Sequence, residues 1–68
     1  MTAEEVGKLI REQRKSLGLT QTEASGLCGV GITFLSRLER GHEAAELAKV
    51  LKVMRSLGIE IQAGGRGK

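Results

Sequence analysis

Few side chains in this sequence are of the types that perform covalent or metal chemistry. Cys28 is the single cysteine and His42 the single histidine, which excludes a disulfide framework and a four-ligand zinc site built from Cys and His. The chain also lacks a glycine-rich phosphate loop, and no nucleophile stands in a pattern that pairs it with a base. We therefore expect neither enzymatic activity nor a cofactor.

The chemistry that remains is that of basic and hydrogen-bonding side chains. Eleven Lys and Arg residues oppose eight acidic ones, and the net charge of +3 permits contact with a polyanion without requiring it. Sixty-eight residues allow one small domain, whose core must be aliphatic because Phe34 is the single aromatic residue. No apolar run approaches the about 18 residues that span a bilayer, and residues 1–5 are polar and acidic. We expect a cytoplasmic protein without a membrane partner.

Start and stop signals divide most of the chain into four predicted helices. Thr2 with Glu5, and Thr20 with Glu23, have the spacing of capping boxes, in which each side chain caps the other residue's amide. A glycine follows each periodic apolar stretch, where a left-handed residue ends a helix. The predicted helices cover residues 3–17, 21–28, 32–40 and 44–57. In the fourth helix the predicted inner stripe is Leu47, Val50, Leu51, Met54 and Leu57.

After Gly58 the apolar period changes from helical to alternating. Residues 59–63 alternate apolar and polar side chains, which predicts a strand formed by Ile59, Glu60, Ile61, Gln62 and Ala63. A lone strand needs a partner for its backbone groups, and the same strand of a second copy supplies one. The expected organisation is therefore a domain over residues 1–58, a dimerisation strand over 59–63 and a flexible tail over 64–68.

The second and third helices are joined by the short glycine-containing segment 29–31, as in a helix-turn-helix. The motifs Thr20-Gln21-Thr22-Glu23, Gly29-Val30-Gly31 and Leu35-Ser36-Arg37-Leu38-Glu39-Arg40-Gly41 resemble the hallmark of the Cro/phage-repressor (XRE-type) family, T-Q-x-E, G-V-S and I-S-x-L-E-x-G. The likeness covers about residues 4–57. It implies an all-α, four- to five-helix lambda-repressor-like DNA-binding domain with a short C-terminal strand that pairs across a dimer.

Downstream residues narrow the resemblance. Residues 35–41, the pattern Ala45-Glu-Leu-Ala-Lys-Val-Leu and the strand after Gly58 are similar to the HipB-type antitoxins. This resemblance implies a homodimeric autorepressor that binds double-stranded DNA at operator inverted repeats. It further implies a HipA-like kinase toxin as a second partner.

The family resemblance also implies which residues face DNA. Its third helix lies in the major groove, so that base contacts are expected from Gly31, Ile32, Thr33, Ser36 and Arg37. Arg37 is the main candidate because a guanidinium can donate two hydrogen bonds to guanine. Phosphate contacts are expected from Gln21, Thr22, Arg40, Arg11 and Lys15. Arg14 and Glu39 match a structural ion pair of the family, and His42 is expected to be a turn residue or a phosphate donor.

Some of these expected DNA contacts also have a simpler structural interpretation. Ile32 could pack against the second helix instead of facing DNA, and Arg40 and Lys15 could be solvated charges. Gly31 replaces the serine that usually caps the third helix, and Leu27 stands where the family exposes a polar residue. These departures favour one alternative, a module that sequesters a protein partner without binding DNA. A stand-alone helix-turn-helix regulator is the other alternative.

Overall fold

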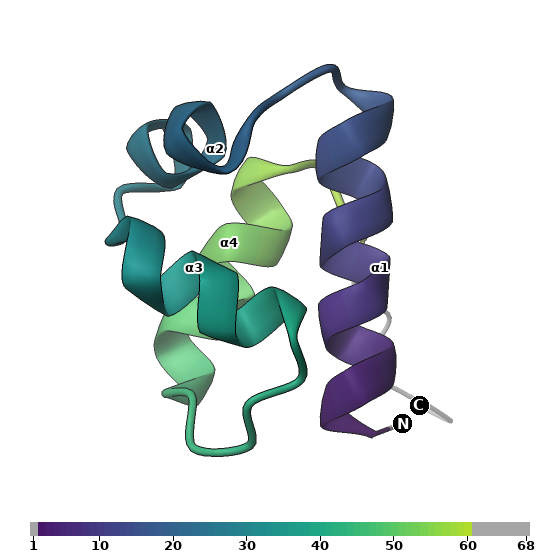
Figure 1. Ribbon diagram of the computed structural model, residues 1–68, viewed down its shortest axis with the longest axis vertical. Helices are drawn as coiled ribbons and strands as arrows, with labels where there is room; N and C mark the ends of the chain where they lie inside the picture. Colours follow the sequence, from purple (N-terminus) through teal and green to yellow (C-terminus); the bar gives the residue numbers. More distant parts are fainter. Residues whose placement is uncertain (1, 61–68) are drawn as a thin grey trace, which may run out of the picture.

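Four α-helices follow one another in the part of the chain that the computed structural model describes, residues 2–60. They are α1 (Ala3–Ser16), α2 (Gln21–Cys28), α3 (Ile32–Glu39) and α4 (Leu47–Ser56). Figure 1 shows α1 standing on one side, with α2, α3 and α4 gathered beside it. α1 packs against α3, and α2 packs against both α3 and α4. The expected small all-α architecture is therefore confirmed, and within these residues no strand is present.

The first two helices begin at the capping boxes that the sequence predicts. At α1 the Glu5 amide donates to Thr2 Oγ1 at 3.1 Å, and the Thr2 amide donates to Glu5 Oε1 at 2.7 Å. The same reciprocal pair opens α2, between Thr20 and Glu23, at 3.1 and 2.8 Å. Each box satisfies two amides that the helix itself cannot bond. In contrast, α3 begins at Gly31 without a side-chain cap.

All four helices end at a glycine with positive φ, as the sequence predicts; these are Gly18, Gly29, Gly41 and Gly58. At the end of α4 the Gly58 amide donates to the Arg55 carbonyl oxygen at 3.1 Å, and the Ile59 amide donates to that of Met54 at 2.8 Å. This pair of hydrogen bonds needs a residue in the left-handed conformation, which glycine adopts without steric cost.

Three helix ends lie one residue earlier than predicted, at Ser16, Glu39 and Ser56. The start of α4 is wrong by three residues, because the helix begins at Leu47 and not at Ala44. Its N-cap, Glu46, makes no side-chain cap bond, so no capping signal marks the start in the sequence. The inner face also differs from the predicted stripe: Leu47 is 70% exposed, whereas Val53 is fully buried.

The core is aliphatic, as the composition requires. Its buried members come from all four helices and the residue that ends α4: Ile10, Ala24, Cys28, Leu35, Leu38, Val53, Met54 and Leu57. Val30 of the α2–α3 turn and the ring of Phe34 are half-buried and pack against this cluster. Full burial of one such aliphatic side chain is worth about 1.5–3 kcal/mol. Both helices of the helix-turn-helix therefore depend on the packing they share with α1 and α4.

The strand predicted for residues 59–63 is not found in the part that the structure describes. Ile59 and Glu60 follow α4 without regular secondary structure. The Ile59 amide is already used in ending α4, and its side chain packs against the core. Ile61, Gln62 and Ala63, like the tail 64–68, lie outside the described residues. No helix within residues 2–60 has the length and apolar character needed to cross a membrane.

Candidate nucleic-acid interface

The position of α3 is set by its close approach to α1. Gly7 of α1 faces the backbone of α3, and a Cβ atom there would lie 2.8 Å from the Glu39 carbonyl oxygen and closer still to that of Leu38. A Cβ atom on Gly41, just after α3, would lie 2.9 Å from Cα of Glu4. Side chains at these two glycines would separate the segments. The C-terminal end of α3 is therefore seated directly on the backbone of α1.

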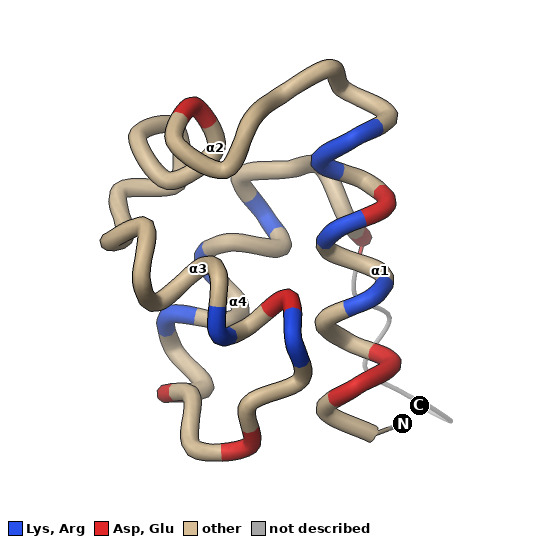
Figure 2. Tube along the Cα trace, viewed as in Figure 1, with Lys and Arg blue, Asp and Glu red and all other residues tan. Residues whose placement is uncertain are grey.

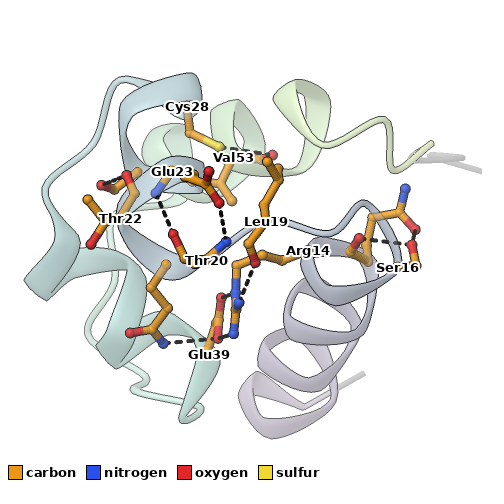
Figure 3. Close-up of polar contacts among 12 residues, drawn as sticks. Arg14, Ser16, Leu19, Thr20, Thr22, Glu23, Cys28, Glu39 and Val53 are labelled. Atoms are coloured by element: carbon orange, nitrogen blue, oxygen red, sulfur yellow. Dashed lines mark hydrogen bonds and ion pairs between the residues drawn. The ribbon is translucent and has the colours of Figure 1, made fainter.

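A buried ion pair fastens the same two helices (Figure 3). Arg14 Nε donates to Glu39 Oε2 at 2.6 Å, and Arg14 Nη2 donates to Glu39 Oε1 at 3.0 Å. The third donor, Nη1, reaches the Leu19 carbonyl oxygen at 2.8 Å, and Gln21 Nε2 donates to Glu39 Oε1 at 3.1 Å. Arg14 and Glu39 are each 8% exposed. The ion pair that the sequence analysis expects between Arg14 and Glu39 is present in the structure.

This pair connects three helices at one point. The hydrogen bonds that Arg14 donates to the Glu39 carboxylate raise the pKa of Arg14, against the opposing effect of burial. Loss of one partner of a buried pair typically costs about 3–5 kcal/mol, because the other charge is left without compensation. Gln21 adds α2 to the cluster, which sequence reasoning missed because it lies 18 residues away from Glu39 in the chain.

Buried side chains of α2 face the inside of the domain. Ser25 is 8% exposed, and its hydroxyl donates to the Thr22 carbonyl oxygen at 2.9 Å. Cys28 is 1% exposed, and burial raises the pKa of its thiol, so it is a core residue. On the outside, Lys52 Nζ of α4 donates to the Gly29 carbonyl oxygen at 3.4 Å. The C-terminus of α2 lies there, and the helix dipole favours a cation at that end.

The outer face of α3 is exposed in the part of the chain that the structure describes. Thr33, Arg37 and Arg40 are exposed at i, i+4 and i+7, and Ser36 is half-buried beside them. Ile32 is 46% exposed and does not belong to the side chains that pack against the core. Thr33, Arg37 and Arg40 therefore form a continuous polar and basic row, and Ile32 lies exposed at the start of the helix.

The residues expected at phosphates lie on three helices. Arg11 and Lys15 are exposed at i and i+4 on α1, and Thr22 is exposed in the first turn of α2. Gln21 is half-buried, and one of its two amide N–H donors is used by Glu39. Figure 2 shows basic segments along α1 and at the end of α3 but none on α2. The structure does not bring Arg11 or Lys15 into contact with the basic residues of α3.

The surface beside the end of α3 is hollowed. Arg37, Arg40 and His42 line this hollow together with Gly41, Glu43 and Ala44 of the loop that follows. His42 thus joins the two arginines, a proximity that follows from the tight turn at Gly41. Within residues 2–60, no group of three or more His, Cys, Asp and Glu side chains could hold a metal ion. The chemistry that this face offers is the binding of anions and of hydrogen-bond acceptors.

Comparison with known proteins agrees with this geometry. Residues 10–63 match the family described as Helix-turn-helix. A protein of Sinorhizobium fredii, named as an HTH-type transcriptional regulator, is 42% identical over 60 residues, which are 88% of this chain and 79% of that protein. A protein of Methanothermobacter thermautotrophicus with the same kind of name is 42% identical over 52 residues, 76% of this chain and 75% of its own. The chain therefore belongs to the helix-turn-helix family.

Proposed function

We propose that the chain is a sequence-specific DNA-binding transcriptional regulator that reads its operator with α3. The exposed outer face of this helix is the observation that carries the proposal. Thr33, Arg37 and Arg40 are exposed in one row, while Leu35 and Leu38 hold the opposite side of the helix in the core. An α-helix with such a face fits the major groove of B-DNA. The relatives named as transcriptional regulators support the same function.

Arg37 is proposed to carry the main base contact. Its guanidinium can donate to O6 and N7 of one guanine, a contact worth about 1–3 kcal/mol of discrimination. Thr33 and Ser36 lie beside it and can donate to a base or a phosphate. Gly31 has no atom within 4 Å of the position of a Cβ, so the first turn of α3 and Ile32 can approach base edges closely.

Phosphate contacts are proposed on both sides of α3. Arg40 extends its exposed row, and Arg11 and Lys15 offer cations from α1. Gln21 and Thr22 stand at the start of α2, where backbone amides favour an anion. Such contacts release counterions, so the logarithm of the binding constant should fall with the logarithm of salt concentration at a slope of about −0.9 for each phosphate neutralised.

The test is selection of binding sites from random duplexes, followed by anisotropy titrations at several salt concentrations. Arg37→Ala should lose the guanine preference at one position in each half-site. Arg37→Lys is the matched control: it keeps the charge and the salt slope but loses the two-bond geometry. A flat salt slope and no selected sequence would overturn the proposal. That result would favour a protein-binding module, with Leu27, 59% exposed, as its contact.

We further propose that the regulator is a homodimeric repressor of an operator with inverted repeats. The described chain reaches Glu60 beside a surface hollow lined by Leu51, Arg55, Gly58 and Ile59. The alternating segment 59–63 follows directly, and pairing of two copies would place the recognition helices about 34 Å apart. Sedimentation equilibrium should give the mass of a dimer. Ile61→Glu, at an apolar position of the alternation, should give monomers, whereas Gln62→Glu should not.

The finer proposal is that this repressor is the antitoxin of a HipBA-like module. It rests on the resemblance of residues 35–58 and of the segment that follows to HipB-type antitoxins. A kinase-like protein should then co-purify with the tagged chain from its native cells, and production of that kinase without the chain should stop growth. Purification of a dimer that binds DNA but retains no kinase would leave a stand-alone regulator.

A further inference from the structure

The centre of the proposed reading surface is uncharged. Between Lys15 and Arg37 the only charged residue is Glu23, so the basic side chains of the proposed interface lie on either side of residues 16–36. Figure 2 shows this gap along α2 and the first part of α3. Within this stretch lies Ile32, the first residue of α3, 46% exposed and preceded by Gly31 with open space around it. An apolar side chain therefore leads α3 between two groups of cations.

Ile32 offers no hydrogen bond, so it can select only by apolar contact. If Ile32 faced the cytosine amino group or a purine N7, it would displace the water bound to that polar group without replacing the lost hydrogen bond. The C5 methyl of thymine is the apolar group that the major groove presents, and 5-methylcytosine carries a methyl at the same ring position. We propose that Ile32 selects a pyrimidine with a C5 methyl group in each half-site, whether thymine or 5-methylcytosine. This inference rests on the proposed function.

The geometry of α3 also gives the position of this pyrimidine. Ile32 and Arg37 are five residues apart, which is about 7.5 Å along a helix at about 1.5 Å per residue. Base steps follow one another at about 3.4 Å along B-DNA. With α3 aligned along the major groove, the methyl-bearing pyrimidine is expected about two base pairs from the guanine that Arg37 reads. The cations on either side supply the attraction to phosphates, and Ile32 adds a preference that salt does not weaken.

The test uses the duplex selected by the protein and changes one pyrimidine at a time. Replacing thymine with deoxyuridine removes only the methyl group, and replacing cytosine with 5-methylcytosine adds only that group. Affinity should fall about fourfold for uracil at one position per half-site, as expected for one buried methyl. At the same position 5-methylcytosine should bind about fourfold more tightly than cytosine. Both ratios should be the same at low and high salt.

Ile32→Ala should bring both ratios at that position close to one and keep the guanine preference at the Arg37 position. Leu17→Ala, which shortens an exposed leucine to which the proposal gives no base contact, is the matched control and should leave both ratios unchanged. Equal binding of thymine and uracil probes at every position, with the guanine preference intact, would overturn this inference and leave the proposed function standing. Absence of any selected sequence would overturn both. The nucleotide probes need only the unaltered protein, so the folding of a variant does not decide the result.

Discussion

Two helical glycines of this chain should respond in opposite directions to the same substitution. Gly7 lies within α1 and Gly26 within α2, and neither has a positive φ. A Cβ atom at Gly26 would meet nothing within 4 Å. A Cβ atom at Gly7 would meet the backbone of α3, at 2.8 Å from the Glu39 carbonyl oxygen and still less from that of Leu38. Carbonyl groups of a helix cannot rotate away as a flexible side chain could.

The expected sizes follow from these surroundings. Alanine in place of glycine stabilises a helix interior by about 0.5–1 kcal/mol, so Gly26→Ala should raise the free energy of unfolding by about that amount. At Gly7 the same gain is opposed by an overlap whose cost lies near the upper end of about 1–3 kcal/mol for overpacking. The net loss for Gly7→Ala is then about 2 kcal/mol. For a domain of this size each kcal/mol shifts Tm by about 4–8 °C.

Urea denaturation followed by circular dichroism would measure both variants against the unaltered chain. Gly7→Ala should unfold at lower urea with an unchanged slope, and its DNA affinity should also fall, because α3 must move off α1. Gly26→Ala should unfold at higher urea. If Gly7→Ala proved as stable as Gly26→Ala, the close seating of α3 on α1 would be refuted as a determinant of this fold.

Three further predictions concern buried and capping groups. Arg14→Met strands the Glu39 carboxylate and should lower the free energy of unfolding by about 3–5 kcal/mol, whereas joint replacement of both residues by apolar ones should cost much less. The hydrogen bond from the Thr2 amide holds the pKa of Glu5 below its usual value, so this cap stabilises the protein above the unfolded pKa and is lost as pH falls through the folded one. The stability difference between the unaltered chain and Glu5→Gln should therefore be present at neutral pH and vanish at strongly acidic pH. Cys28 should resist thiol reagents until the protein unfolds, because it is buried and its pKa is raised; modification at the rate of a free thiol would contradict this.

Local signals account for the parts of the fold that the sequence predicts well. The boxes at Thr2 and Thr20 and the glycine after each helix act within four or five residues, so they can be read without tertiary information. The predicted start of α4 is wrong because no residue among 43–46 caps the helix, so packing alone decides where it begins. The apolar periodicity of residues 44–57 predicts that Leu47 lies on the buried face of this helix. In the structure Leu47 is exposed, and the buried face includes Val53.

The candidate site divides in the same way. The family motif located α3 and paired Arg14 with Glu39, but the hydrogen bond from Gln21 depends on how α2 sits against α3. Spacing alone also left open whether Ile32 packs inward, because its exposure depends on the crossing of two helices. The stretch without basic residues between Lys15 and Arg37 is visible in the sequence, yet its place between two basic groups becomes plain only in three dimensions.

The division of α3 into two faces has a consequence for how such proteins diversify. One face of α3 is buried in the domain, with Leu35, Leu38 and Glu39. The side chains on the other face, Thr33 and Arg37, are exposed and contribute nothing to the core. Exposed substitutions of this kind usually change stability by less than about 0.5 kcal/mol. A lineage can therefore exchange its target sequence in a few mutational steps without a compensating change in the interior, so duplicated copies are free to acquire new operators while keeping one scaffold.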